Sequence, residues 1–222
     1  MHIINLKPQK HLINYYDISF ACTLCNSKEI WLLNCSEGCQ HLLRKKNIKI
    51  SYISKIIITN LSIENISGLL GLLSSLSLIN RQKKLSIYSP QGLNKYLNLG
   101  KKYSQTNFRY NIYFHTLKTG LIIDHSRYQV YTLKNKSQFD LLIIQHEKFG
   151  KFQLLKAKKF YLLEGPLYGK LKKGSDLLLP DGLILYSSTF TNKNTSGIKT
   201  SIISNKYNRR QYIECSKRST IL

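Results

Sequence analysis

The most informative part of the chain is residues 56–73, which read IIITNLSIENISGLLGLL. The β-branched residues of 53–59 favour a strand, and the leucines of 68–80 favour a helix that is buried against a sheet. A polar turn joins the two, which is typical of α/β proteins. The alternation continues on both sides. We expect strands at 28–34, 53–59 and 84–89, and helices at 37–46, 68–80 and 91–99.

The second half of the chain is richer in strands. Residues 165–174 read GPLYGKLKKG and are bounded by turn-forming glycines, so we expect an exposed loop or arm there. We predict a single domain, 1–222, with an arm over roughly 147–182 and a basic tail over 207–222. The other elements expected are strands at 109–114, 121–124, 128–133 and 141–145, and a lysine-rich helix near 152–160.

The charge of the chain indicates a polyanionic partner. The 222 residues include 34 Lys and Arg against 11 Asp and Glu, a formal charge of +23, and 42% are hydrophobic, enough to bury a core. Nucleic acid is the first expectation and an anionic membrane surface the second. The longest apolar run, 66–79, is shorter than the roughly 20 residues that span a bilayer, and no signal peptide is visible. We therefore expect a soluble protein with no membrane partner.

Four cysteines have the spacing of a zinc site. Cys22 and Cys25 are three residues apart, and Cys35 and Cys39 follow. The first pair lies in a segment that reads as a strand, where positions three apart point to opposite faces. We expect small buried hydrophobic side chains rather than thiolate ligands. With Cys215 the count is odd, and a reducing compartment is the simplest interpretation.

Four segments, in order, resemble ribonuclease Z, the tRNA 3′-end endonuclease of the metallo-β-lactamase superfamily. Residues 31–40, WLLNCSEGCQ, resemble the family's F-D-C-G-E-G-T-Q segment. Residues 56–73 resemble I-F-I-T-H-L-H-G-D-H-I-F-G-L-P-G-L-L without a gap. Residues 87–93, IYSPQGL, are similar to I-Y-G-P-x-G-L. Residues 164–174, with LPDG behind them at 179–182, are similar to P-x-G-P-L-Y-G-x-L-K-x-G followed by L-x-D-G.

The resemblance implies a fold and a metal site. The fold is α/β, the metallo-β-lactamase αββα sandwich of two facing sheets with helices outside, shortened towards its C-terminus and carrying a protruding Lys-rich arm. The family binds two zinc ions with His and Asp. Those positions fall here at Asn60, Ser62, Asn65, Asn135 and, with poorer alignment, Asn205. We therefore expect no metal and no cofactor.

One acid remains at the family's proton-transfer position, Glu64, which is the candidate catalytic residue. The six histidines, His2, His11, His41, His115, His125 and His146, are scattered and have no metal-ligand spacing. Whether the chain is an enzyme stays open on these residues. The resemblance names an endoribonuclease, while the replaced ligands argue against hydrolysis.

The resemblance also implies a tRNA-binding arm. Its candidate residues are Gly165, Pro166, Tyr168, Lys170, Lys172 and Lys173. Glycine lets the backbone approach a phosphate, lysine supplies charge, and tyrosine offers a stacking face. Family members form homodimers, so tRNA or pre-tRNA and a second copy are the expected partners, and pairing with an intact paralogue is conceivable.

Three hypotheses for the function remain open. The first is a tRNA-binding protein of tRNA 3′ maturation whose metal site has decayed. The second is an active zinc phosphodiesterase with a rearranged site around Glu64, and the third is a non-functional relic. The excess of Ile, Leu, Lys, Asn, Ser and Tyr is typical of A/T-rich coding sequence, which together with the resemblance favours a plastid (chloroplast) protein.

Overall fold

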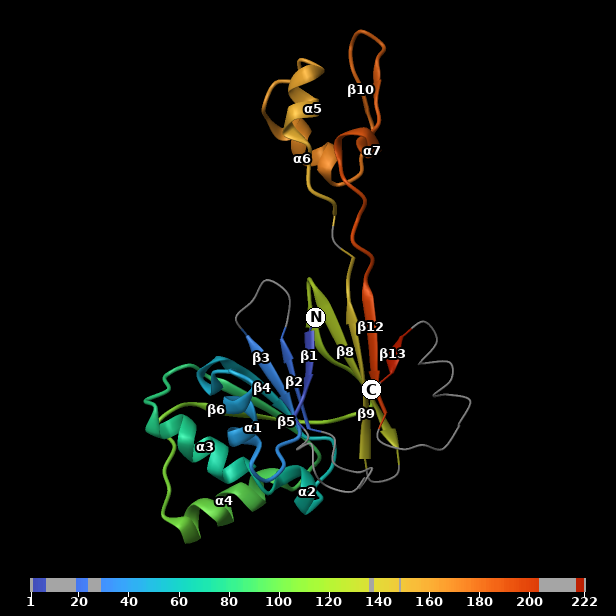
Figure 1. Ribbon diagram of the computed structural model, residues 1–222. Coiled ribbons are helices and arrows are strands. Elements are labelled where there is room, and N and C mark those ends of the chain that lie inside the picture. The colour runs from blue at the N-terminus through green and yellow to red at the C-terminus, as the bar shows by residue number, and fades with distance from the viewer. Residues whose placement is uncertain are drawn as a thin grey trace.

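The computed structural model describes residues 2–6, 19–23, 29–135, 138–147, 149–203 and 219–221. Two sheets lie face to face in the body of the molecule, and a small lobe projects from one of them (Figure 1). The expected basic tail lies outside the described residues except for 219–221. Within the described part of the chain, no helix is long and apolar enough to cross a membrane.

The first sheet has six strands in the order β1-β2-β3-β4-β5-β6. The pairs from β3 to β6 are parallel, and β1 and β2 add antiparallel pairs. Helices connect the parallel strands, as the alternating sequence pattern predicted. The strands are β1 (His2–Asn5), β2 (Phe20–Thr23), β3 (Ile30–Leu33), β4 (Ile53–Ile57), β5 (Leu85–Ser89) and β6 (Ile112–Thr116). The connecting helices are α1 (Cys39–Lys45), η1 (Ile50–Tyr52), α2 (Ile63–Ile66), α3 (Leu69–Leu78) and α4 (Leu93–Ser104).

The second sheet has five strands in the order β13-β12-β9-β8-β7, antiparallel except between β12 and β13. Its strands are β7 (Gly120–His125), β8 (Tyr128–Asn135), β9 (Gln138–Gln145), β12 (Ile198–Ile202) and β13 (Thr220–Ile221). The strands expected at 121–124, 128–133 and 141–145 are confirmed, and the one expected at 109–114 begins and ends slightly later, as β6.

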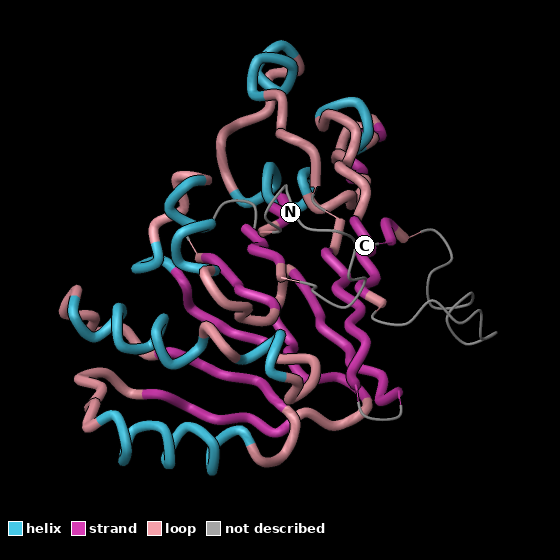
Figure 2. The backbone as a smooth tube through the Cα atoms, turned by 60° about the horizontal axis from the view of Figure 1, so that its bottom comes forward, coloured by secondary structure: helices cyan, strands magenta, loops and turns pink. Residues whose placement is uncertain are grey.

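Two hydrophobic clusters define the layers of the body. One packs α1, α3 and α4 on the outer face of the first sheet, through residues such as Leu43, Leu72 and Leu97. The other lies between the sheets and joins Trp31 of β3 to Val130 of β8. The Trp31 and Tyr128 rings meet edge to face with centroids 4.8 Å apart. The order is therefore helices, sheet, sheet, and Figure 2 shows the helices lining one side of the body. The described residues form no helical layer outside the second sheet.

The lobe is residues 149–197, between β9 and β12. It contains the helices α5 (Leu154–Lys159), α6 (Pro166–Lys172) and α7 (Ser187–Phe190), and a short hairpin of β10 (Leu177–Leu178) and β11 (Ile184–Leu185). The protruding arm is confirmed, and it extends past the boundary expected at 182. The prediction of a loop at 165–174 is wrong in one respect, because the centre of this segment is the helix α6. Pro166 is favoured in its first turn because an N–H is not needed there.

Candidate functional site

The turn after β4 carries the first three positions of the family's metal signature. Asn60 Oδ1 accepts hydrogen bonds from the Ser62 hydroxyl at 2.8 Å and the Ser62 backbone N–H at 3.3 Å. It also accepts a hydrogen bond from Nδ2 of Asn65. We call these three residues, Asn60, Ser62 and Asn65, the polar cluster. Sequence reasoning assigned all three to one site, and in the structure they are hydrogen-bonded to one another.

The polar cluster is anchored to the loop that follows β3. The backbone carbonyl of the buried Asn65 accepts a hydrogen bond from the Cys35 N–H at 2.8 Å, and the Gly68 N–H donates to Cys35 O at 3.0 Å. Nearby, Asn34 Oδ1 accepts both the N–H and the hydroxyl of Thr59, at 2.9 and 3.1 Å. A network of neutral groups therefore holds the turn, and no carboxylate takes part in these bonds.

One oxygen of the polar cluster lacks a donor. Asn65 Oδ1 is buried and receives no hydrogen bond from the described residues. Buried polar atoms are usually satisfied, so this atom is where a water or a cation would bind first. It is a single neutral oxygen, however, and zinc in proteins is bound by thiolate, imidazole and carboxylate groups.

Glu64 lies in the first turn of α2 and is exposed. Its carboxylate makes no ion pair with the described residues. It is adjacent in sequence to Asn65 but takes no part in the hydrogen bonds of the polar cluster.

The second sheet brings a further expected position to this edge. The Phe139 N–H donates to Thr59 O at 3.0 Å, which ties the start of β9 to the turn after β4. Asn135, buried at the end of β8, pairs with Gln138 across the same hairpin. Three family ligand positions and Asn135 therefore lie at one edge of the sandwich. Asn205 lies outside the described residues.

The described residues contain no group of three or more His, Cys, Asp or Glu side chains that could hold a metal ion. Cys22, Cys35 and Cys39 are buried and free, and Cys25 and Cys215 lie outside the described residues. The Cys35 and Cys39 sulfurs are 3.1 Å apart and hydrogen-bonded. That bond raises the pKa of Cys35 and lowers the pKa of Cys39.

The histidines are separated as their spacing predicted. His115 stacks on Tyr88 and His125 on Tyr128, with ring centroids 4.6 and 4.5 Å apart. His41 and His146 are exposed. His11 lies outside the described residues, as does the side chain of His2.

The lobe has a hydrophobic core of its own, formed by Ala157, Leu162, Leu171, Leu185 and Phe190. Tyr168 packs against this core, its ring centroid 4.9 Å from that of Phe152, and its hydroxyl donates to Leu162 O at 2.7 Å. The side chain that we expected to face RNA is thus partly used to hold the lobe together. Gly165 and Gly169 have open space where a side chain would stand, so both leave their backbone accessible.

Two chain segments around Phe152 and Thr191 run side by side and form a narrow neck between the lobe and the body. The Asn192 N–H donates to Lys151 O at 3.0 Å, and the Gln153 N–H donates to Phe190 O at 2.8 Å. A Cβ at Gly150 would lie 1.8 Å from Asn192 O, so only glycine lets these two segments approach so closely. The neck sets the lobe away from the body (Figure 1).

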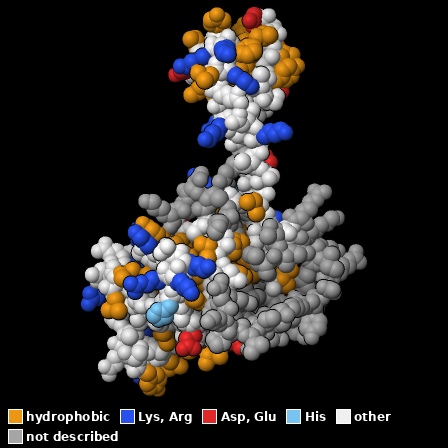
Figure 3. Space-filling model, viewed as in Figure 1, with side chains coloured by type: hydrophobic (Ala, Val, Ile, Leu, Met, Phe, Trp, Pro, Cys, Tyr) orange, Lys and Arg blue, Asp and Glu red, His pale blue; other side chains and the backbone are white. Residues whose placement is uncertain are grey.

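The lobe surface combines lysines with exposed apolar side chains (Figure 3). It has eight lysines against three acidic residues, and Lys170, Lys172 and Lys173 are all exposed. Sequence reasoning assigned no RNA-binding role to the other exposed lysines, which are Lys151, Lys156, Lys158, Lys159 and Lys193. The three lysines among residues 156–159 were the signal that could have extended the predicted RNA-binding surface to α5. Leu155, Tyr161 and Leu163 are 79, 94 and 86% exposed, and no sequence pattern singled them out.

The lobe and the polar cluster lie at opposite ends of β9. Phe139, at the start of the strand, bonds the turn after β4, while Gln145, at its end, pairs with Ile198 next to the neck. Six residues of extended strand separate them by about 20 Å. Figure 1 shows the same arrangement, with α2 at one end of the second sheet and the lobe beyond the other.

Comparison with known proteins agrees with this architecture. No family model matches the chain. The crystal structure of human tRNase Z, short form, superposes with a TM-score of 0.52 and 24% identity, over 58% of each chain. The sandwich, together with this likeness, defines a protein of the metallo-β-lactamase fold.

Relatives by sequence give the family. The chain is 33% identical over 207 residues to ribonuclease Z of Acaryochloris marina, which covers 92% of this chain and 66% of that protein. It is 43% identical over 187 residues to the uncharacterized protein ycf56 of Pyropia yezoensis, covering 83% and 71%. The ribonuclease Z of Nostoc sp. is 35% identical, but only 53% of its length is covered. The chain belongs to the ribonuclease Z family, and it spans between half and two thirds of these ribonuclease Z relatives.

Proposed function

We propose that this protein binds tRNA or pre-tRNA in tRNA 3′-end maturation, and that it grips the RNA with the lobe without forming a hydrolytic zinc centre. The observation that carries the proposal is the lysine-rich lobe on its neck, in a chain of the ribonuclease Z family. Its eight lysines meet the charge of a phosphate backbone, and its open glycines allow close approach.

The residues at the family's ligand positions do not fit zinc. In the polar cluster, Asn60 Oδ1 already accepts three hydrogen bonds, and the cluster offers neither imidazole nor carboxylate. Asn and Ser oxygens suit a hard cation only when carboxylates help. Glu64 is the nearby acid, and its exposed side chain is outside the hydrogen-bonded network.

The energetic consequence is large. Zinc lowers the pKa of bound water from about 15.7 to about 7, so without it the hydroxide nucleophile costs about 12 kcal/mol more. A general base such as Glu64 contributes about 3 to 5 kcal/mol. We therefore infer that an isolated chain does not cleave RNA at a useful rate, and that its contribution is binding.

The position of the lobe favours a second copy as a partner. The lobe and the polar cluster lie at opposite ends of β9, so an RNA held at the lobe is free to contact the body of a second copy. In a homodimer, the lobe of one copy presents RNA to the body of the other. Pairing with an intact paralogue would supply the missing metal site by the same geometry.

We also place the protein in the plastid. The biased composition supports this, since Ile, Leu, Lys, Asn, Ser and Tyr dominate the chain. The identity to the ycf56 proteins of Pyropia yezoensis and Porphyra purpurea, 43% and 39%, is the second support. Fractionation of cells with an antibody against the protein tests the assignment.

The decisive experiment uses a 3′-extended pre-tRNA with and without a chelator. We expect binding that weakens steeply with salt, by roughly 10³- to 10⁵-fold between 50 and 200 mM if six to ten phosphates are contacted. We expect no cleavage in either condition. Cleavage that a chelator abolishes would instead establish the alternative, an active zinc phosphodiesterase, and the absence of any RNA binding would contradict the proposal.

A further inference from the structure

Two cavities adjoin on the body, at the amino ends of β4 and β5, whereas the polar cluster follows the carboxyl end of β4. The first has a volume of about 750 Å³ and lies between α1, η1 and the end of α3. The second, about 430 Å³, lies between η1, the start of β4 and the turn before β5. Ser51 lines both, so the two cavities are neighbours, and we call them together the basic groove.

The lining of the basic groove is strongly cationic. Its only acidic residue is Glu29, which lies 3.9 Å from the Lys55 ammonium. The other cations have no carboxylate within ion-pair distance among the described residues. The six Lys and Arg side chains that line it are Arg44, Lys49, Lys55, Arg81, Lys83 and Lys84.

Arg81 fixes the floor of the second cavity. Its side chain is buried, with 7% exposed, and it donates to the backbone carbonyls of Lys83, Ser51 and Lys84 at 2.8, 3.1 and 3.0 Å. These bonds use three of its five N–H donors and leave its charge without a carboxylate partner among the described residues. The same bonds hold the backbone that carries Lys83 and Lys84 in place, so the cations are presented from a rigid base.

Lys55 shows that the charges are crowded. Burial lowers the pKa of this ammonium, and the charge of Lys84 lowers it further, against the opposing effect of Glu29. Its side chain also lies over the Trp31 ring, 4.9 Å from the centroid. An anion in the cavity would relieve this repulsion, because it would face several cations at once.

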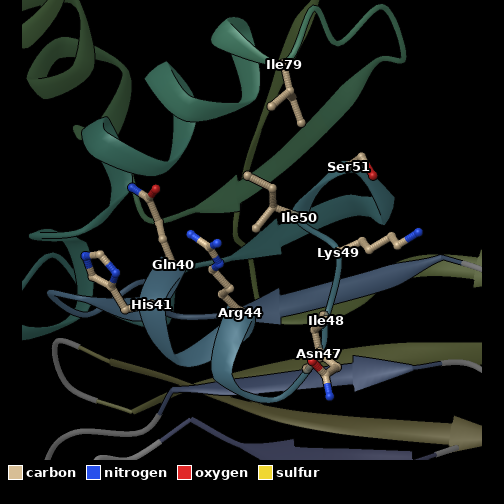
Figure 4. Close-up of a pocket in the computed structure, with 9 residues that line it drawn as sticks. All are labelled: Gln40, His41, Arg44, Asn47, Ile48, Lys49, Ile50, Ser51 and Ile79. Carbon is tan, nitrogen blue, oxygen red and sulfur yellow. The ribbon is translucent and has the colours of Figure 1, made fainter.

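The first cavity adds a further cation, Arg44, on the other side of Ser51. Figure 4 shows Arg44 rising from α1, with its guanidinium between Gln40 and Ile50. Lys49 lies farther along the rim. Figure 3 shows Lys and Arg side chains gathered on this part of the body. The cations therefore extend over more of the surface than one phosphate group could neutralise.

We propose that the basic groove binds the phosphate backbone of a double-stranded RNA segment, as a contact surface of the body separate from the lobe. The exposed Lys49, Lys83 and Lys84 meet phosphates from the rim, and the cavities receive the phosphate oxygens. Such contacts position an RNA without reading its sequence. The inference rests on the proposed function only in taking RNA as the partner.

The test uses the full chain and a short blunt RNA duplex that has no tRNA elbow. Binding is measured by fluorescence anisotropy between 50 and 200 mM salt, for the wild type, for the groove variant K49A/K83A/K84A and for the control variant K95A/K102A/K118A. The control removes three exposed lysines that do not line the groove. Alanine keeps the carbonyls that Arg81 requires, so the groove variant should fold.

We expect the groove variant to lose at least about tenfold in affinity at 50 mM salt, and its slope of log K against log salt to fall by about three. The control variant should change much less. Equal losses in the two variants, or no binding of the duplex by the wild type, would overturn the proposal. Binding of inorganic phosphate or AMP as tightly as the duplex would also overturn it, in favour of a small-ligand site.

Two further measurements keep this test separate from that of the proposed function. Acetylation of lysines on the wild-type protein, with and without duplex, should show protection of Lys49, Lys83 and Lys84, whatever the stability of the variant. The lobe variant K170A/K172A/K173A should bind the duplex normally but bind pre-tRNA weakly. If pre-tRNA is bound no better than the duplex, the proposed function fails while the groove survives. If only the lobe variant loses RNA binding, the groove proposal fails while the function survives.

Discussion

The Ser62 hydroxyl donates a 2.8 Å hydrogen bond to Oδ1 of Asn60, in the turn between β4 and α2. The same oxygen accepts the Ser62 N–H and the Asn65 amide, so its lone pairs are directed at protein donors and not at a cation. We expect the purified protein to carry well below one zinc per chain, as measured by mass spectrometry of the metals. Treatment with a chelator should leave the thermal unfolding midpoint unchanged.

A variant that restores the family pattern is the control for this metal prediction. N60H/S62H/E64D/N65H places imidazole and carboxylate groups where the neutral network now stands, and these are groups that bind zinc. Its zinc content should rise above that of the wild type under the same loading conditions. Stoichiometric zinc in the wild type would contradict the prediction.

Removing the lysine charges in and directly after α6 should weaken tRNA binding, because it removes salt-dependent contacts to phosphates. K170A/K172A/K173A deletes three exposed ammonium groups from the lobe without touching its core. We expect the slope of log K against log salt for pre-tRNA to fall by about three, because each lysine that meets a phosphate contributes about one. Filter binding at two salt concentrations measures it.

The control for the lobe variant removes equal charge elsewhere on the molecule. K95A/K102A/K118A lowers the net charge of the chain by the same amount, so it reports the general loss of long-range attraction. If both variants flatten the slope equally, the lobe has no special part in binding.

The strands and helices of the body could be predicted from the sequence because their hydrophobic periodicity is strong. The three isoleucines of 56–58 and the leucines of 69–78 lie in β4, its following residue and α3, within two residues of the expected boundaries. The αββα expectation came from motif resemblance and not from periodicity. The sheets, their order and the pairing of β9 with β12 depend on contacts between distant residues, which periodicity does not encode.

The sequence assigned residues to the candidate site, but it did not show the hydrogen bonds between their side chains. Aligned motifs could assign Asn60, Ser62 and Asn65 to the ligand positions, but side-chain hydrogen bonds depend on the backbone of the turn. The helix α6 was missed because GPLYGKLKKG contains three glycines, and glycine has a low helix propensity. Leu171 supplies the missing stabilisation by packing into the core of the lobe, which local sequence does not reveal.

Replacing Gly68 should destabilise the body. A Cβ there would lie 2.2 Å from Ser36 O and 3.2 Å from Cys35 O, and backbone atoms cannot move aside cheaply. We expect Gly68→Ala to lower the free energy of unfolding by about 1 to 3 kcal/mol, which is typical of overpacking. Urea denaturation followed by circular dichroism measures it.

Gly169→Ala is the matched control for Gly68→Ala. Nothing lies within 4 Å of a Cβ at this position, and the residue is inside α6. Alanine should therefore be neutral or stabilise the lobe by about 0.5 to 1 kcal/mol. A loss of stability at Gly169 as large as that at Gly68 would show that the close approach to Ser36 is not the cause.

Cys22 should make the fold sensitive to alkaline pH. Burial raises the pKa of this thiol from 9.0 to about 12. A raised pKa contributes stability below pH 9, and the contribution is lost as pH rises towards 12, because only the unfolded chain ionises in that range. When the pH is raised from 8 to 10, the unfolding free energy of the wild type should fall by about 1.4 kcal/mol more than that of Cys22→Ala.

The control for Cys22→Ala is Val130→Ala, which truncates a buried side chain of the same cluster without removing a titratable group. Both variants lose packing at every pH. Only Cys22→Ala should flatten the dependence of the unfolding free energy on pH, measured by urea titrations at several pH values. Parallel curves for the two variants would rule out the thiol as the source.

Tyr168→Phe should loosen the lobe alone. The hydroxyl donates to Leu162 O at 2.7 Å, and phenylalanine leaves this acceptor without that donor while it keeps the ring against Phe152. We expect a cost of about 1 kcal/mol, seen as roughly fivefold faster amide hydrogen exchange in α6 and unchanged exchange in α3. Affinity for pre-tRNA should change little, because the exposed lysines of α6 remain. If binding falls sharply while exchange in α6 stays the same, the hydroxyl contacts the RNA directly and its bond to Leu162 is secondary.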